Sequence, residues 1–288
     1  MTAISLVALP PAAGAAGGEA GEILPGVHVI SGRFAPGVPA DGNSLVFEAP
    51  DGLIVIDTGR DAEHAQDVID LAGEAQAPIA AVITTHWHID HVGGNALVRR
   101  TFPRARFYGG PPPREGMAGL PEDTAIPPPD ELITTTGPRV IAGRPLLIGV
   151  ADHAVTTSDL WIYDPRTRVL ATGDLVTLPV PRFDSACPRG WQAALWRLST
   201  LDFRLLIPGH GAPMSRRGFE TYRRAFENLL ARAGTDSIPR DALVEGWMRD
   251  AAPLIPAGER EGARMLLGGY IDTVLRATPD AGTNPCAE

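Results

Sequence analysis

The chain has 288 residues and a formal net charge of −9, with 44% hydrophobic and 20% charged residues. This balance is that of a globular protein with a sizeable core, and it argues against a disordered or fibrous chain. The acidic charge and the lack of a basic run argue against a nucleic-acid partner. All 25 basic residues are arginine, so chemistry that needs a lysine is excluded. Two cysteines are too few for a disulfide framework.

Residues 1–21 are predicted to be a leader that precedes the folded domain. An apolar stretch, Ile4–Leu9, is followed by small residues from Ala12 to Ala20, as in a secretory signal, but a basic start is missing. The leader is therefore either a truncated signal peptide, which implies a periplasmic or secreted protein, or a disordered segment of a cytoplasmic one. Nothing later approaches about eighteen consecutive apolar residues, so no transmembrane helix is expected.

The first half of the predicted domain, which spans residues 22–277, is dominated by short apolar runs typical of strands. A turn signal at Asp51-Gly52 predicts a hairpin. Helices are expected at Asp61–Ala72 and at Asn95–Arg100, and the proline-rich stretch Pro111–Pro129 is expected to be a long loop. The predicted strands are Val27–Ile30, Ser44–Glu48, Leu53–Ile56, Ile79–Thr84 and Arg106–Tyr108.

The second half repeats this order before two amphipathic helices close the domain. One helix is lined by residues from Phe219 to Leu230 and the other by residues from Met265 to Leu275, and residues 278–288 are expected to be a mobile tail. The repeat of strands and helices predicts an α/β fold, an αββα sandwich of two mixed β-sheets flanked by helices. The remaining predicted elements are strands at Pro138–Ile141, Leu146–Val150, Leu160–Tyr163, Val169–Thr172 and Leu205–Ile207 and a helix at Trp191–Ser199.

Three histidines and an aspartate follow directly after a predicted strand. In an extended stretch alternate side chains point the same way, so His86, His88 and Asp90 are predicted to converge. His91, at the following turn, can reach a neighbouring point. Imidazoles and a carboxylate suit zinc, and four such groups crowd one tetrahedral ion. The segment therefore predicts two adjacent metal positions.

The run His86-Trp87-His88-Ile89-Asp90-His91 resembles the HxHxDH signature of the metallo-β-lactamase superfamily. The family's other markers have counterparts in the same order. Such a set is specific for the fold and much less specific for the substrate. The counterparts are Ile56-Asp57-Thr58-Gly59, Thr172-Gly173-Asp174-Leu175 and Pro208-Gly209-His210-Gly211.

The resemblance implies ligands for two metal ions, expected to be Zn²⁺ with iron or manganese as alternatives. Metal 1 would be held by His86 and His88, and metal 2 by Asp90, His91 and His210.

Two aspartates complete this implied centre, and one expected histidine is missing. Asp174 would bridge both ions, and Asp57 would accept a hydrogen bond from a ligand histidine and so fix its tautomer. The family usually places a third metal-1 histidine where this chain has Val155. His153 lies two residues earlier, and we expect it to serve instead, since a catalytic zinc usually has three protein ligands.

The predicted function is a dinuclear zinc-dependent hydrolase. A water shared by two ions is deprotonated near neutral pH, and the bridging hydroxide attacks an ester, thioester, lactone or amide of a small molecule. Asp90 is expected to orient this hydroxide and is the predicted catalytic residue. Trp87 and Arg182 are candidate substrate-binding residues, although a solvent-facing role suits Arg182 equally well.

Two alternatives remain, a weak β-lactamase and a metal-binding scaffold. β-Lactamases of the superfamily typically lack the bridging aspartate, so only weak β-lactamase activity is expected. Glyoxalase II-type thioesterases share Asp174, but their Gly-Cys-Gly-Arg segment has no counterpart in Leu178–Asp184. The second alternative is a non-catalytic or weakly active metal-binding scaffold with an impaired metal-1 site, motivated by Val155. His28 and His64, the latter on a surface helix, are expected to be structural.

Overall fold

The computed structural model describes residues 20–33, 38–113, 126–183, 186–235 and 237–272. The predicted tail, most of the leader and most of the proline-rich loop lie outside these residues. None of the described helices combines the length and the hydropathy that a membrane span requires.

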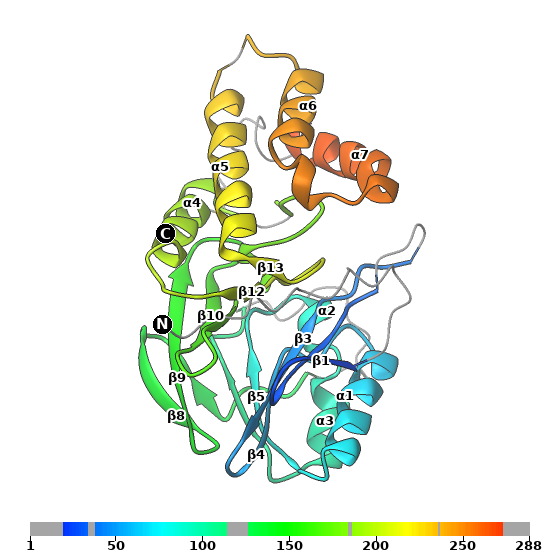
Figure 1. Cartoon of the computed structure of the whole chain (residues 1–288), viewed down its shortest axis with the longest axis vertical. Coiled ribbons are helices and arrows are strands. Elements are labelled where there is room, and N and C mark those ends of the chain that lie inside the picture. The colour runs from blue at the N-terminus through cyan, green and yellow to red at the C-terminus, as the bar shows by residue number, and fades with distance from the viewer. Residues whose placement is uncertain (1–19, 34–37, 114–125, 184–185, 236, 273–288) are drawn as a thin grey trace, which may run out of the picture.

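The first sheet is mixed and has its strands in the order of the sequence (Figure 1). Its first four strands are antiparallel, and β4 to β7 pair in parallel. The predicted turn at Asp51-Gly52 joins β3 to β4 as a hairpin. The strands are β1 (Ala20–Leu24), β2 (Val27–Ile30), β3 (Ser44–Ala49), β4 (Gly52–Ile56), β5 (Ile79–Thr84), β6 (Arg106–Gly109) and β7 (Glu131–Leu132).

The second sheet is also mixed, in the order β13-β12-β11-β10-β9-β8. Only β11 and β12 are parallel, and the other neighbours are antiparallel. The strands are β8 (Gly137–Ile141), β9 (Arg144–Asp152), β10 (Ser158–Asp164), β11 (Val169–Ala171), β12 (Leu205–Ile207) and β13 (Met214–Ser215).

Helices cover the outer faces of both sheets, and apolar side chains fill the three layers between. One core lies between the two sheets, where residues such as Phe47 and Ile54 meet Ile148 and Ile162. A second core packs α1 and α3 on the first sheet, and a third packs the remaining long helices on the second. These helices are α1 (Ala62–Glu74), α3 (Asn95–Thr101), α4 (Pro188–Leu198), α5 (Arg216–Ala233), α6 (Arg240–Asp250) and α7 (Arg260–Tyr270).

This arrangement confirms the predicted αββα sandwich. Helix α1 begins one residue later than expected because Asp61 is its N-cap and accepts from the backbone N–H groups of Glu63 and His64. The sequence pattern missed α6, whose apolar residues are too irregularly spaced to mark one face. It also missed β1, of which Ala20 and Gly21 fall inside the predicted leader.

Candidate metal centre

The residues of the four motifs lie at the carboxyl ends of four strands. Asp57 follows β4, and Thr85 to His91 follow the parallel neighbour β5. Asp174 lies in a 3-10 helix (η1, Gly173–Leu175) after β11, and His210 follows its parallel neighbour β12. Carboxyl ends of parallel strands meet at one edge of a sheet, so each sheet brings two motifs to the same edge.

The segment after β5 does not stay extended. His88 is the N-cap of a one-turn helix, α2 (Ile89–Val92), which contains Asp90 and His91. The expected alternation of side chains therefore ends at His88, and Asp90 and His91 reach the centre from a helical turn instead.

Two groups of ligand-type atoms form at this edge, in the part of the chain that the structure describes. One group contains His86, His88 and Asp174, and the other contains Asp90, His91 and His210. Within each group the candidate ligand atoms lie within 4.8 Å of one another. The structure thus brings six of the seven sequence-predicted ligands together, in the two sets that the resemblance implied.

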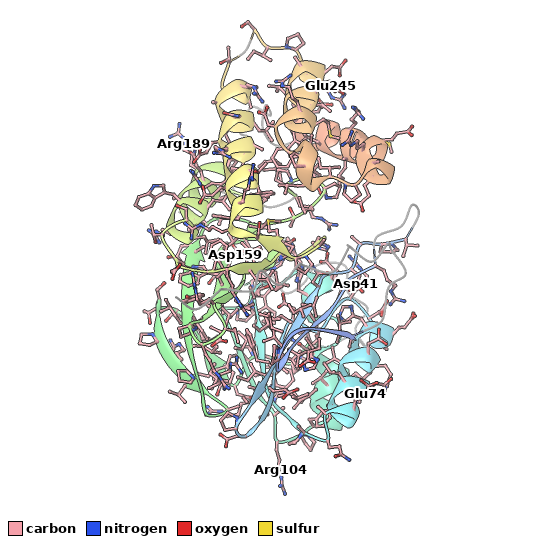
Figure 2. All side chains as sticks on the ribbon, viewed as in Figure 1. Asp41, Glu74, Arg104, Asp159, Arg189 and Glu245 are labelled. Carbon is pink, nitrogen blue, oxygen red and sulfur yellow. The ribbon has the colours of Figure 1, made fainter. Side chains whose placement is uncertain are left out.

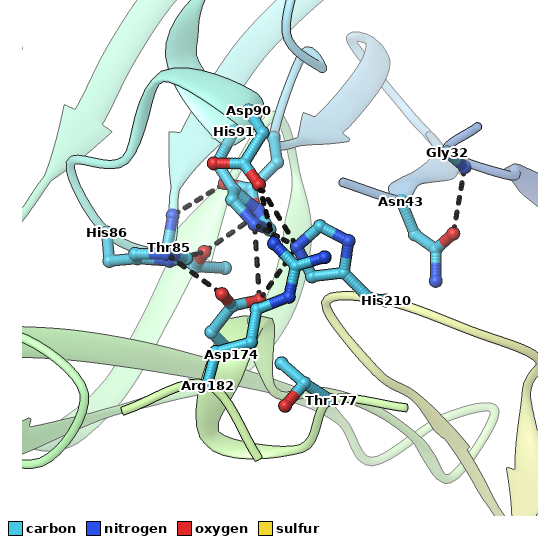
Figure 3. A network of polar contacts seen from close by, with 12 residues as sticks. Gly32, Asn43, Thr85, His86, Asp90, His91, Asp174, Thr177, Arg182 and His210 are labelled. Carbon is cyan, nitrogen blue, oxygen red and sulfur yellow. Dashed lines mark hydrogen bonds and ion pairs between the residues drawn. The ribbon is translucent and has the colours of Figure 1, made fainter. Parts of the chain in front are cut away.

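Asp174 lies between the groups (Figure 3). Its Oδ2 is 3.6 Å from His86 Nε2, and its Oδ1 is 3.2 Å from His91 Nε2 and 3.4 Å from His210 Nε2. In the second group, His210 Nε2 also lies 3.2 Å from Asp90 Oδ2. Each oxygen of Asp174 therefore faces a different group, an arrangement that suits a carboxylate bridging two ions.

Hydrogen bonds behind the histidines fix which ring nitrogen faces the centre. Asp57 Oδ1 accepts from the backbone N–H of Thr85, and Asp57 Oδ2 accepts from the Thr85 hydroxyl at 2.7 Å. Asp57 Oδ2 also lies 2.8 Å from His91 Nδ1, and Thr85 Oγ1 lies 3.0 Å from His86 Nδ1. Because Thr85 donates to Asp57, its oxygen accepts from His86. In their neutral, metal-binding forms both histidines then carry the proton on Nδ1 and present an unprotonated Nε2 to the centre. The part of Thr85 was not predicted from the sequence.

The charged side chains of the centre shift one another's pKa values. Burial lowers the pKa of His88 to about 4, and the neighbouring His86 adds to the shift, so His88 is neutral at physiological pH. Burial alone would lower the pKa of His91, but the carboxylates of Asp174 and Asp57 outweigh it and raise the pKa well above its ordinary value. Burial would raise the pKa of Asp174, but His210 and His91 hold it well below its usual range. The Asp174 carboxylate is therefore ionised, as a metal ligand must be.

The donor set fits divalent transition-metal ions. His86 Nε2 and Asp174 Oδ1 are buried and have no hydrogen-bond partner. Burying polar atoms without partners is costly, and metal coordination would remove that cost. Four of the six groups are imidazoles and two are carboxylates, a combination that suits zinc, iron or manganese.

His153 lies outside both groups. It follows β9 directly, has a positive φ of 49°, and its Nδ1 is buried without a hydrogen-bond partner. Gly190 of α4 packs against its carbonyl, since a Cβ there would lie 1.8 Å from the oxygen. Val155, at the usual histidine position, is fully buried. A role for His153 at metal 1 stays a prediction.

The two candidate substrate-binding residues differ in their surroundings. Trp87 is 9% exposed and donates from its indole N–H to the carbonyl of Gly110, so it packs between the ends of β5 and β6. Arg182 reaches the centre instead, with Nη1 3.4 Å from Asp90 Oδ2. His64, which was expected to be structural, is buried and joins Asp41 to Ser44 by contacts of 2.7 and 2.8 Å.

Asn43 fixes the loop that carries His210, a role the sequence analysis missed. Its side-chain amide donates to the carbonyls of Pro208 and Gly211 at 2.9 Å, and its oxygen accepts from the backbone N–H of Gly32. Beside it, Gly42 leaves room for the ring of His91, since a Cβ would lie 2.6 Å from that ring. Asn43 therefore fixes the loop of His210, and Gly42 leaves room for the ring of His91.

Asn43→Ala should lower the free energy of unfolding of the metal-free protein by about 1–3 kcal/mol, since buried carbonyls lose their donors. It should also weaken the binding of one metal equivalent, measured by competition with a chelator. Asn43→Asp keeps the acceptor for Gly32 but loses both donors, so it should show the same metal defect. Normal metal binding in both variants would contradict this role.

The comparisons with known proteins agree with this geometry. A family model described as the metallo-beta-lactamase superfamily matches residues 37–210, more than half of the chain. Hydroxyacylglutathione hydrolases of Nostoc punctiforme and Chromohalobacter salexigens are each 30% identical to it, over 182 and 188 residues. These matches cover 54% and 60% of this chain and 66% and 64% of those proteins, so the chain spans about two thirds of their length.

Solved structures show the same fold. A metallo-beta-lactamase from Pontibacter korlensis has a TM-score of 0.60 at 21% identity and covers 73% of this chain and 99% of its own. The match of the family model includes all six clustered ligand candidates, and the two sheets have the arrangement of that neighbour. The chain belongs to the metallo-β-lactamase superfamily.

Proposed function

We propose that the protein is a metal-dependent hydrolase that binds two zinc ions and cleaves a small-molecule ester, thioester, lactone or amide. The observation that carries this proposal is the position of Asp174, whose two carboxylate oxygens face two separate groups of ligand-type atoms. Similarity to hydroxyacylglutathione hydrolases supports the reaction class and makes a glutathione thioester the first substrate to test.

The chain's own residues supply binding and orientation. His86 and His88 would hold one ion, Asp90, His91 and His210 the other, and Asp174 both. Bound divalent ions lower the pKa of water and polarise a substrate oxygen.

Asp90 is suited to a part in the reaction as well as to binding. Its Oδ2 faces His210 and Arg182, and these contacts fix the orientation of the carboxylate. Although burial alone would raise the pKa of Asp90, the contact with His210 holds it below its usual range, so the carboxylate is ionised and can accept a hydrogen bond from an attacking water.

The test combines metal analysis with a substrate panel. We expect two equivalents of zinc per chain and turnover of at least one thioester, lactone, ester or amide. His88→Ala should remove one equivalent and abolish turnover, whereas Arg104→Gln, at the far lower end of the molecule in Figure 2, should change neither. Turnover that survives chelation and the His88 variant would contradict the proposal.

A metal-binding scaffold without catalysis is the second candidate. It is favoured by one observation, the position of His153 outside both groups of ligand atoms. In that case the protein would bind a single ion and would turn over no thioester, lactone, ester or β-lactam.

A further inference from the structure

Two arginines approach the candidate metal centre from different loops. Arg60 follows β4, and Arg182 lies in the segment after η1. Arg182 Nη1 is 3.4 Å and Arg60 Nη2 is 3.8 Å from the same atom, Asp90 Oδ2. Figure 3 shows the guanidinium group of Arg182 reaching in among Asp90, Asp174 and His210.

The backbone around Arg60 is held firmly. Its N–H donates to Asp41 Oδ1 at 2.8 Å, and its Nε donates to the carbonyl of Ala40. Asp41 is itself buried and held by His64. The guanidinium group of Arg60 is therefore directed to Asp90 by contacts that do not involve the metal centre.

The segment of Arg182 is held by the helices on the second sheet. Its neighbour Phe183 is fully buried and packs on the rings of Trp191, Phe226 and Tyr270. Trp247 of α6 donates from its indole N–H to the carbonyl of Pro179. An arginine placed by a packed core loses little conformational freedom on binding a ligand, which favours recognition.

Both arginine side chains can meet a ligand from solvent. Arg182 is 13% and Arg60 is 26% exposed, whereas Asp90 and His210 are almost fully buried. His88 is the one partly exposed member of the two ligand groups. The partly exposed residues therefore mark the side from which a substrate reaches the centre.

Little negative charge faces the two guanidinium groups of Arg60 and Arg182. In the described part of the chain, Asp90 is the only carboxylate within 4.0 Å of either guanidinium side chain, and it also faces His210. Any cation that Asp90 binds would take up part of its charge. Two guanidinium groups then share less than one negative charge, in a chain whose net charge is −9.

We propose that Arg60 and Arg182 form a subsite for a carboxylate of the substrate, next to the bond that is cleaved. The proposal rests on the proposed function, because it names the class of substrate for the same site. Guanidinium groups bind carboxylates through paired, charge-assisted hydrogen bonds, and a local positive potential raises the encounter rate of anions. The enzyme would therefore prefer acids over neutral molecules of equal size.

Two ester substrates of equal length test this preference. Ethyl hydrogen succinate and ethyl butyrate differ in a carboxylate against a methyl group, and hydrolysis is followed by proton release. The zinc-loaded wild type should show a higher kcat/KM for the succinate. Arg182→Gln should lower the ratio of kcat/KM for the succinate to kcat/KM for the butyrate about 10- to 100-fold, the worth of a charged hydrogen bond. The ratio is the measure because Arg182 also contacts Asp90, so some loss on both esters is expected. Arg60→Gln should act in the same direction, and Arg104→Gln should change neither value.

A binding measurement separates this inference from the proposed function. Succinate is titrated calorimetrically into the zinc-loaded wild type, Arg182→Gln and Arg104→Gln proteins, which needs no turnover. If succinate binding is lost only in the Arg182 variant, the subsite is supported, even when neither ester is hydrolysed. The lack of turnover would then count only against ester hydrolysis. Equal losses on both esters, or succinate affinity unchanged in Arg182→Gln, would show that the arginines only neutralise Asp90. Circular dichroism confirms that each variant is folded.

Discussion

Replacing Asp174 by asparagine should lower kcat/KM about 100- to 1000-fold and reduce zinc binding from two equivalents to one or fewer. The reason is its position between the groups, with Oδ2 3.6 Å from His86 Nε2 and Oδ1 3.2 Å from His91 Nε2. Asparagine has one acceptor oxygen in place of two and carries no charge, so one group of ligands must lose its carboxylate. Loss of one preorganised electrostatic group in an active site typically has an effect of this size.

The measurements are zinc content after dialysis and steady-state kinetics on whichever substrate of the panel is turned over. Asp51→Asn is the matched control, because Asp51 is an exposed turn residue at which asparagine is equally acceptable. Thermal unfolding of the metal-free variants separates loss of metal from loss of fold. An Asp174→Asn protein that keeps two zinc ions and wild-type kinetics would remove the basis of a bridged centre.

The positions of most strands and the grouping of the ligands could be predicted because both depend on short-range patterns. A strand that ends in Asp57 or in the histidine run is marked by apolar residues that are adjacent in sequence. The same holds for the strands before Asp174 and His210. Once parallel strands place these ends at one edge, the ligands meet without further information.

What could not be predicted depends on contacts between distant segments. The side chain of Asn43 bonds to Pro208, 165 positions away, and no local pattern distinguishes it from a turn asparagine. Helix α2 has four residues, too few to show a helical period, so the extended reading of Asp90 was wrong. His64 was expected to be structural, but its partners Asp41 and Ser44, which lie about twenty positions earlier, could not be read from the sequence.

The surroundings of Val155 could not be predicted from the sequence either. The sequence shows that the usual histidine is missing, but not whether the backbone at His153 rearranges. In the structure His153 Nδ1 remains buried without a partner, outside both groups. That outcome depends on small backbone shifts in one turn, which composition and periodicity do not determine.

Asp57→Asn should lower the affinity for zinc about 10- to 100-fold and the free energy of unfolding by about 1–3 kcal/mol. If the amide oxygen keeps the bond to the Thr85 N–H, the amide NH₂ group replaces the oxygen that faces Thr85 Oγ1 and His91 Nδ1. That group donates, so His91 must carry its proton on Nε2. The Thr85 hydroxyl then turns to donate to His86 Nδ1, which moves the proton of His86 to Nε2 as well. Both ligand nitrogens would be blocked by a single substitution.

The backbone should tolerate this change, because Asp57 has a φ of 59° and asparagine adopts that region as readily as aspartate. Asp130→Asn is the matched control, since Asp130 also accepts a backbone N–H, that of Phe107, but contacts no histidine. Chelator competition gives the zinc affinity, and long-range ¹H–¹⁵N spectra of the metal-free protein report which ring nitrogen of each histidine is protonated. A variant with weaker zinc binding but unchanged histidine tautomers would mean that Asp57 acts through its charge alone, and unchanged zinc affinity would mean that it does not orient the ligands at all.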